Sequence, residues 1–229
     1  MDENSLLFRI SAWVLPILIA VPIHEAAHGW AAWKLGDDTA FNLGRVTFNP
    51  LKHIDPFGTI LLPGMLLLVS GGAAAFGFAK PVPVNFWRLR NWKRDTVIVA
   101  VAGPLSNLIL AILSAILFHA LALVPEAIRS WTGAMLFASV SINLILFVFN
   151  MLPMPPLDGG RVAVALLPAE LGAQLARLER AGFIIILTAL FLLPWVGDQI
   201  GIDLNVFQWL VFEPAQFLMR IIAVAVGFG

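Results

Sequence analysis

Long apolar runs separated by short polar breaks dominate the chain. Runs long enough to cross a bilayer as helices cover residues 6–34, 96–123 and 131–152. A shorter apolar run follows at residues 181–196. Residues 205–228 are apolar but carry charged side chains, so this stretch either spans or lies at the interface. The pattern predicts an all-α polytopic membrane protein with about five to six transmembrane helices.

The pattern changes directly after the first run. In residues 40–55 the apolar side chains Phe41, Leu43, Val46 and Phe48 partly alternate with polar ones. Alternation with a period of two is typical of a strand with one buried face rather than of a helix. We therefore expect a small membrane-associated β segment, a short strand or hairpin, after the first helix.

Residues 57–78 are apolar and long enough to span, but proline and glycine interrupt them at Pro63, Gly64, Gly71, Gly72 and Gly77. Basic residues flank the stretch on both sides: Lys34, Arg45, Lys52, Lys80, Arg88, Arg90, Lys93 and Arg94. If the stretch crossed the membrane, these cations would lie on opposite sides. If it enters and returns, they all lie on one side, as the positive-inside rule prefers. We therefore favour a re-entrant loop.

The distribution of charge also predicts the orientation of the chain. Residues 162–180 are expected to form an amphipathic helix on the membrane surface. With the N-terminus outside, the basic segments 34–94 and 161–180 are both cytoplasmic, and eleven of the fourteen Lys and Arg residues lie inside. The inverse topology would place this excess outside, so we favour the first arrangement.

Composition agrees with a membrane protein and excludes several kinds of site. Of the 229 residues, 60% are hydrophobic and only 12% are charged, with a mean hydropathy of +0.90. We expect one membrane-embedded domain over residues 1–229, with a core at about 8–165 and C-terminal helices at about 166–229. The net charge of zero argues against nucleic acid as a partner. Without cysteine, a metal can bind only through His, Asp, Glu or Asn.

A His-Glu-x-x-His pattern lies within the first apolar run. His24 and His28 are four positions apart and therefore share one face of a helix, with Glu25 beside them. At about 1.5 Å per residue, His24 lies roughly 15 Å below Lys34. In soluble zinc proteases this pattern supplies two metal ligands and a general base. The structural alternative is that these three polar side chains bind no metal and form hydrogen bonds with neighbouring helices.

A catalytic zinc ion needs a third protein ligand, and Asp158 is the best candidate. It follows a span that should return to the face of Lys34, and Gly159 and Gly160 allow close backbone packing around it. The alternative role for Asp158 is an N-cap of the next helix. Asp55 and Asp95 are weaker candidates, because basic neighbours and the interface explain them.

Asn107 and Asn150 are amide side chains within apolar helices. An amide can hold a substrate backbone or stabilise an oxyanion in acyl transfer, and it can equally tie two helices together. We take both as candidate substrate-binding residues.

Linked motifs occur in this order: His24-Glu25-Ala26-Ala27-His28; Asn49-Pro50-Leu51-Lys52-His53-Ile54-Asp55-Pro56; Gly77-Phe78-Ala79-Lys80-Pro81-Val82-Pro83-Val84-Asn85; Ala102-Gly103-Pro104 with Asn107; and Asn150-Met151-Leu152-Pro153-Met154-Pro155-Pro156-Leu157-Asp158-Gly159-Gly160. Together they resemble the site-2 protease family of intramembrane zinc metalloproteases, over roughly residues 10–165. The chain has room for neither the PDZ nor the CBS domain that many members carry, so it resembles a minimal form.

The resemblance implies one Zn²⁺ ion per chain, with His24, His28 and Asp158 as ligands and Glu25 as the base. It implies that Asn150 helps to hold the substrate, a transmembrane protein segment cleaved within or beside the bilayer. We expect an integral, multi-pass protein of a prokaryotic cell membrane, with the site nearer the cytoplasmic face. Whether it forms a homo-oligomer is left open.

Two other classes of function are compatible with histidines and carboxylates in a span. A membrane metal transporter would need a second half or a series of relay sites, and the sequence contains only one compact cluster. A proteolytically inactive membrane adaptor would keep the fold without cleavage, but Glu25 and every expected ligand are intact.

Overall fold

The computed structural model describes residues 5–69 and 77–228. Its α-helices are α1 (Leu6–Lys34), α2 (Thr39–Asn42), α3 (Leu62–Val69), α4 (Trp92–Leu117), α5 (Glu126–Asn150), α6 (Asp158–Leu166), α7 (Ala169–Arg177), α8 (Glu179–Leu187), α9 (Leu193–Ile200) and α10 (Glu213–Ala225). Short 3-10 turns are η1 (Pro50–His53), η3 (Phe86–Arg88) and η4 (Phe118–Leu123), and π-helical turns are η2 (Pro56–Leu61), η5 (Thr188–Leu192) and η6 (Gln208–Phe212).

Four helical stretches among the described residues are long and apolar enough to cross a membrane: Leu7–Lys34, Trp92–Leu123, Glu126–Asn150 and Glu179–Ile200. They correspond to four of the apolar runs in the sequence, which confirms an all-helical integral membrane protein. The last predicted run, residues 205–228, forms η6 and α10 and is not among the four. The expected total of five to six spans is therefore not confirmed.

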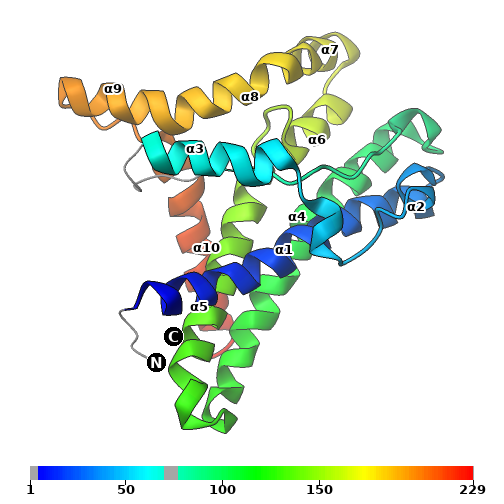
Figure 1. Ribbon diagram of the computed structural model, residues 1–229. Helices are drawn as coiled ribbons and strands as arrows, with labels where there is room; N and C mark the ends of the chain where they lie inside the picture. The colour runs from blue at the N-terminus through cyan, green and yellow to red at the C-terminus, as the bar shows by residue number, and fades with distance from the viewer. Residues whose placement is uncertain (1–4, 70–76, 229) are drawn as a thin grey trace.

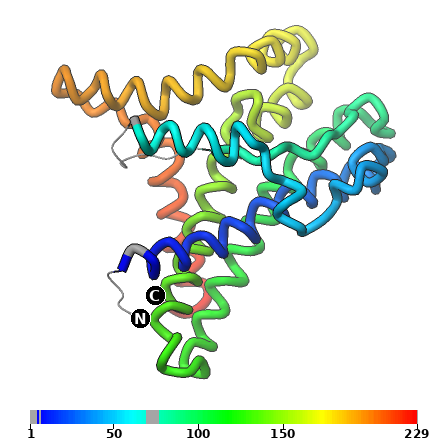
Figure 2. The backbone as a smooth tube through the Cα atoms, viewed as in Figure 1, coloured from blue at the N-terminus to red at the C-terminus, as the bar shows by residue number. Residues whose placement is uncertain are grey.

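The centre of the molecule is a crossing of α1, α4 and α5. Figure 1 shows α4 beside α5 and α1 lying obliquely across them, and Figure 2 follows the same path along the backbone. Helices α1 and α4 are antiparallel, because His28 meets Val99 whereas the earlier His24 meets the later Asn107. Helix α10 packs on α4 and α5 through a buried cluster that includes Ala111, Ala115, Val140, Leu144, Ala215 and Ile222.

Buried and exposed positions are divided by size. On α1 the buried hydrophobic residues include Ala12, Ala20 and Ala26, whereas Leu7, Ile10 and Leu18 are exposed. Small side chains let membrane helices approach closely, and large apolar ones suit contact with lipid. The bundle therefore leaves little room between α1 and α4, which brings backbone groups of α4 within reach of side chains on α1.

The predicted β segment at residues 40–55 is wrong, since no strand occurs among the described residues. Helix α2 instead ends in a Schellman turn at Gly44, whose φ of 62° is favourable for glycine. In this turn Gly44 N–H donates to Phe41 O and Arg45 N–H donates to Ala40 O, both at 2.9 Å. Residues 41–44 are all exposed, apolar and polar alike, so the alternation in the sequence does not mark one buried face.

The two ends of residues 57–78 meet in the structure. The described first part is η2 and α3, a short apolar helical stretch (Pro56–Leu68). Phe78 N–H donates to Gly58 O, and the Thr59 hydroxyl donates to Phe78 O, both at 3.0 Å. The ends of the stretch therefore lie side by side, and the re-entrant loop stays a prediction. Gly71 and Gly72, two of the glycines behind that prediction, lie outside the described residues.

The expected surface helix at residues 162–180 is wrong in its boundaries. Helix α6 begins at Asp158 and packs on α4, and α7 follows as a separate helix. Pro168 divides them, because proline restricts the residue before it and cannot donate to the preceding turn. The first turn of α6 lies beside α1 and α4.

Candidate metal centre

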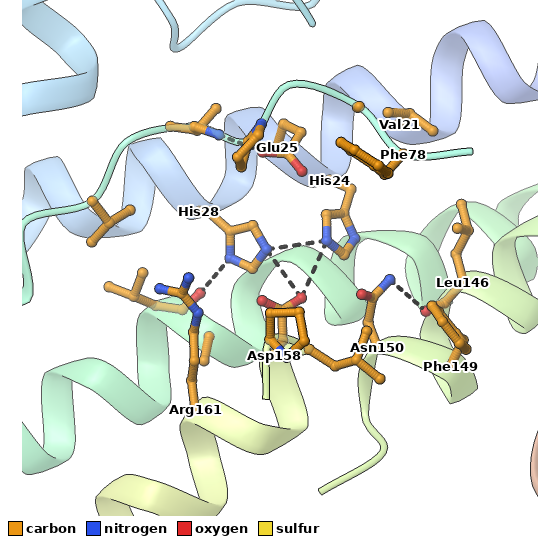
Figure 3. Close-up of a pocket in the computed structure, with 18 of the residues that line it drawn as sticks. Val21, His24, Glu25, His28, Phe78, Leu146, Phe149, Asn150, Asp158 and Arg161 are labelled. Atoms are coloured by element: carbon orange, nitrogen blue, oxygen red, sulfur yellow. Dashed lines mark hydrogen bonds and ion pairs between the residues drawn. The ribbon is translucent and has the colours of Figure 1, made fainter. Parts of the chain in front are cut away.

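The two histidines of α1 point to the same place. His24 and His28 lie one turn apart, are 7% and 8% exposed, and their Nε2 atoms are 3.1 Å apart. Figure 3 shows both imidazoles directed away from the α1 backbone toward Asp158. The helical spacing in the sequence therefore has the predicted consequence.

Asp158 brings a carboxylate to the same point from a distant part of the chain. Its Oδ2 lies 3.3 Å from His24 Nε2 and 3.2 Å from His28 Nε2. It is the first residue of α6 and makes no capping bond there, so the N-cap alternative is not what the structure has. Gly159 and Gly160 pack against the backbone of residues 151–155, where a Cβ would collide.

The outer ring nitrogens fix the protonation of both imidazoles. His28 Nδ1 lies 2.7 Å from Val99 O, a carbonyl that can only accept, so Nδ1 carries the proton. His24 Nδ1 lies 2.6 Å from Asn107 Oδ1, which also accepts. In the neutral rings both Nε2 atoms are then unprotonated, and they present lone pairs to one another and to Asp158.

Three acceptor atoms that converge in this way need a cation between them. With zinc–ligand bonds of about 2.0–2.1 Å, tetrahedral ligand atoms are about 3.3–3.4 Å apart. The observed separations of 3.1, 3.2 and 3.3 Å fit that spacing. The residues present therefore suit a zinc ion.

Gly103 lies directly behind the imidazoles. A Cβ on this residue of α4 would collide with Nε2 of both His28 and His24. Only glycine leaves the space between α4 and the converging nitrogen atoms open. In the Ala102-Gly103-Pro104 motif the central residue is therefore required to be glycine on steric grounds.

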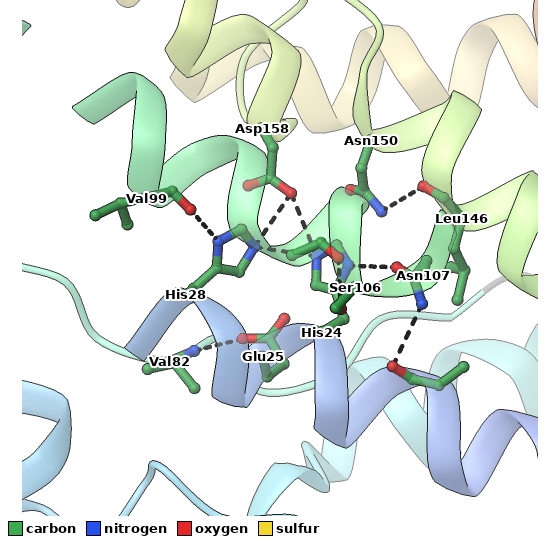
Figure 4. Close-up of polar contacts among 12 residues, drawn as sticks. His24, Glu25, His28, Val82, Val99, Ser106, Asn107, Leu146, Asn150 and Asp158 are labelled. Carbon is green, nitrogen blue, oxygen red and sulfur yellow. Dashed lines mark hydrogen bonds and ion pairs between the residues drawn. The ribbon is translucent and has the colours of Figure 1, made fainter. Parts of the chain in front are cut away.

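Glu25 lies beside the imidazoles and is held by the backbone of a distant segment. Its Oε2 accepts a bond from Val82 N–H at 2.7 Å. Val82 belongs to residues 77–85, an extended segment that we call the strap. Figure 4 shows Glu25 between the strap and the two histidines.

A cavity of about 400 Å³ opens onto this group of residues. Charged or titratable residues lining it are His24, Glu25, His28, Asp158 and Arg161, and most of the others are apolar. Asn150 also lines it. Its amide nitrogen donates to Leu146 O at 3.0 Å, and its amide oxygen lies on the side facing Asp158 (Figure 4).

Comparison with known proteins agrees with this geometry. The model of the family described as "Peptidase family M50" matches residues 12–129 and 121–194. "Putative zinc metalloprotease YwhC" of Bacillus subtilis is 44% identical over 186 residues, which are 79% of this chain and 80% of the relative.

The chain belongs to peptidase family M50, the site-2 protease family.

More distant relatives in family M50 share less of their length. "Putative zinc metalloprotease Rip2" of Mycobacterium tuberculosis is 31% identical over 203 residues, 88% of this chain and 71% of the relative. "Regulator of sigma E protease" of Haemophilus influenzae is 30% identical over 115 residues, 47% of this chain and 25% of the relative. No solved structure matches the chain.

Within this family M50 chain, the structure brings together four of the six residues selected from sequence as one group: His24, Glu25, His28 and Asp158. Asn150 lies at the cavity wall, but Asn107 is fully buried behind His24 and does not line the cavity. We therefore assign Asn107 no direct contact with substrate.

Other residues of the site were not singled out from the sequence. Val99 acts through its carbonyl, which leaves no trace in the type of side chain. Gly103 stands within a motif already noted, although its contact with the histidines depends on how α1 and α4 cross. Arg161 follows Asp158 by one turn, and its guanidinium lies 4.9 Å from the centre of the Phe86 ring. Only the spacing from Asp158 could have indicated Arg161.

Proposed function

We propose that this protein is a zinc-dependent endopeptidase that hydrolyses peptide bonds within or next to transmembrane segments of other proteins. The observation that carries the proposal is the convergence of His24, His28 and Asp158 at a cavity wall, with Glu25 beside them. Two of these ligands and the base lie on α1, which is long and apolar enough to span a membrane. Membership of family M50 supports the peptidase class.

The proposed ligands are His24 Nε2, His28 Nε2 and a carboxylate oxygen of Asp158. Zinc held by these three residues would supply Lewis-acid chemistry: it would lower the pKa of a bound water toward about 7 and polarise the scissile carbonyl. Glu25 accepts a proton from the attacking water and later delivers it to the leaving amine nitrogen. The Val82 N–H holds the Glu25 carboxylate beside the histidines before the substrate arrives.

The substrate must be extended at the scissile bond, because a helix occupies its own carbonyls in internal hydrogen bonds. The strap is suited to hold it. Backbone N–H groups of Phe78, Lys80 and Val82 donate to Gly58 O, His53 O and Glu25 Oε2. Between them, Ala79 lines the cavity and its backbone groups have no partner among the described residues.

We therefore propose that Ala79 pairs with an extended substrate segment as one strand pairs with another. Pro81 and Pro83 lack N–H groups and the N–H groups of Lys80 and Val82 already have partners, so Ala79 supplies the donor at the start of the strap and few registers are possible. Asn150, across the cavity, presents its amide oxygen to a substrate N–H.

Ala79→Pro should slow cleavage about tenfold without loss of zinc, because one backbone donor is removed. Ala79→Ser keeps the N–H and serves as the control. Wild-type rates in A79P would exclude this pairing.

The proposed site lies nearer the cytoplasmic face, since the basic residues around the C-terminal end of α1 and the N-terminal end of α4 lie close to it along those helices. Lys34 ends α1, and Lys93 and Arg94 lie in the first turn of α4. We propose a prokaryotic cell membrane as the location, in keeping with the bacterial relatives.

The deciding experiment compares Glu25→Gln with Asp158→Ala in purified protein reconstituted with a membrane-embedded reporter substrate. E25Q should keep one equivalent of zinc and lose hydrolysis by about 10²–10⁴-fold, because only the base is removed. D158A should lose stoichiometric zinc, whereas Asp198→Ala, a change at an exposed residue of α9, should keep both zinc and activity. Persistent hydrolysis by E25Q would refute the assigned base. A wild-type chain that binds zinc but cleaves no reporter would refute the peptidase assignment.

A further inference from the structure

A line of buried polar side chains leads away from His24 into the helix bundle. The Asn107 amide, which meets His24 Nδ1 through its oxygen, donates from Nδ2 to Asn143 Oδ1 at 2.8 Å. Asn143 Nδ2 in turn donates to Ser139 O at 2.8 Å. Asn107 is 0% exposed and Asn143 is 1% exposed, so water does not compete for these bonds.

The direction of every bond in this line follows from its last member. Ser139 O is a backbone carbonyl and can only accept, so Asn143 must turn its NH₂ group toward it. The Asn143 oxygen then faces Asn107, which must offer its own NH₂ group. The Asn107 oxygen is thereby left facing His24, and His24 must carry its proton on Nδ1.

We propose that Asn143 is a positioning residue that acts through Asn107 to select the Nδ1-protonated form of His24. This form leaves the Nε2 lone pair free toward Asp158 and His28, where the proposed metal ion binds. The inference rests on the metal site of the proposed function and adds a residue on α5 that touches neither metal nor substrate.

Without Asn143, little else fixes the orientation of the Asn107 amide. Its other contact, from Nδ2 to Ala20 O, is long at 3.5 Å and therefore weak. A turned amide would present NH₂ to His24 Nδ1, which would then have to accept. The proton would move to Nε2 and occupy the lone pair that a metal needs. Groups that orient a metal-ligating histidine typically change metal affinity by 10–100-fold when they are removed.

The test is Asn143→Leu, because leucine has the same number and branching of side-chain heavy atoms as asparagine and suits an apolar helix. We expect the zinc dissociation constant, measured by competition with a chelator in detergent, to rise about tenfold. The matched control is Ser141→Ala on the same helix. Ser141 is 8% exposed and donates to Phe137 O at 2.8 Å, outside the line from His24. Its affinity for zinc should stay within about twofold of wild type, as expected for a bond that does not orient a ligand.

A second substitution separates orientation from simple loss of packing. In Asn107→Asp both side-chain oxygens accept, so either orientation keeps the proton on His24 Nδ1. Adding N143L to N107D should therefore leave zinc affinity unchanged or improve it, because two facing oxygens are separated. The coupling between the two sites is the difference in the N143L effect between the two backgrounds. An equal loss in both backgrounds would overturn the proposal.

Thermal unfolding without metal checks that each variant is folded, and Asn143→Ala replaces N143L if the latter is not. Wild-type zinc affinity in a folded N143L or N143A chain would overturn the inference while leaving the proposed function intact. A wild-type chain that binds no metal would overturn both. The Co²⁺-loaded protein gives an independent spectroscopic signature, since a changed His24 ligand should alter the visible absorption of a tetrahedral site.

Discussion

The two histidines of the candidate centre are held by different kinds of group. His28 is fixed by the carbonyl of Val99, part of the α4 backbone. His24 is fixed by the side chain of Asn107, whose own orientation depends on Asn143. A backbone carbonyl cannot turn around or be removed by changing its side chain, whereas an amide can do both. Side-chain substitutions can therefore change the orientation and protonation of His24 more readily than those of His28.

The largest effect should come from a change that disturbs both sides together. Gly103→Ala places a methyl group against Nε2 of His24 and of His28, in the space that the ligands enclose. We expect the purified protein to lose stoichiometric zinc, as measured by elemental analysis. Gly64→Ala is the control, because a Cβ there meets nothing within 4 Å. If G103A retained one equivalent of zinc with normal affinity, the two imidazoles could not be held as described.

Asn107→Leu should affect the His24 side alone. The substitution removes the acceptor for His24 Nδ1 and leaves the Val99 carbonyl in place for His28. We expect zinc affinity to fall about 10–100-fold, the range usual for a group that orients a metal ligand. Chelator competition measures it, with S141A again as the control. A change of less than twofold would contradict the dependence of His24 on this amide.

Glu25, like His28, is held by the backbone, so only proline should remove its support. Val82→Pro deletes the N–H that donates to Glu25 Oε2. Turnover of a reporter substrate should fall about tenfold, because one hydrogen bond to the base is lost, while zinc affinity stays unchanged. Val82→Ala is the matched control, since it shortens the same side chain but keeps the N–H that donates to Glu25 Oε2. Loss of zinc in V82P would show that the strap supports the metal ligands as well.

The smallest effect on the metal should come from Val99→Ala. The Val99 side chain is 2% exposed, so its truncation should lower the stability of the folded chain by about 1 kcal/mol. Its carbonyl remains, and zinc affinity should stay within about twofold of wild type. Thermal unfolding and chelator competition on the same sample measure the two quantities. A tenfold loss of affinity would show that His28 depends on side-chain packing after all.

The sequence predicts those residues of the centre whose role follows from their chemical type and spacing. It does not predict residues whose role depends on a contact between distant helices. His24, Glu25 and His28 follow from helical spacing, and Asp158 from its place at the end of a span. The partners of the two imidazoles do not, because they depend on how closely α1 and α4 pack. Asn107 was therefore expected at the substrate, although it lies behind a ligand, and Asn143 was not selected as a candidate.

Prediction of the fold from the sequence has the same limit. The bounds of α1, Leu6–Lys34, agree with the apolar run, since lipid exposure leaves a continuous signal over many turns. The short segment after it was wrongly predicted as a strand, because Gly44 ends a one-turn helix and the local alternation does not mark a buried face. Pro168 and Gly44 are residues that commonly end helices, but the hydrophobic pattern around them predicted a longer helix and a strand instead.

The metal ligands and the base of the candidate site are held by two different parts of the chain. The metal ligands depend on the buried meeting of α1, α4 and α6, whereas the base depends on a segment fixed at its far end by Asn85 N–H donating to Asp37 Oδ2 at 2.6 Å. A displaced strap should leave a chain that binds zinc but lacks a positioned base, and a disturbed helix crossing should leave a chain that binds no zinc. Bound zinc, measured on variants of the strap and of the helix crossing, therefore distinguishes these two kinds of damage.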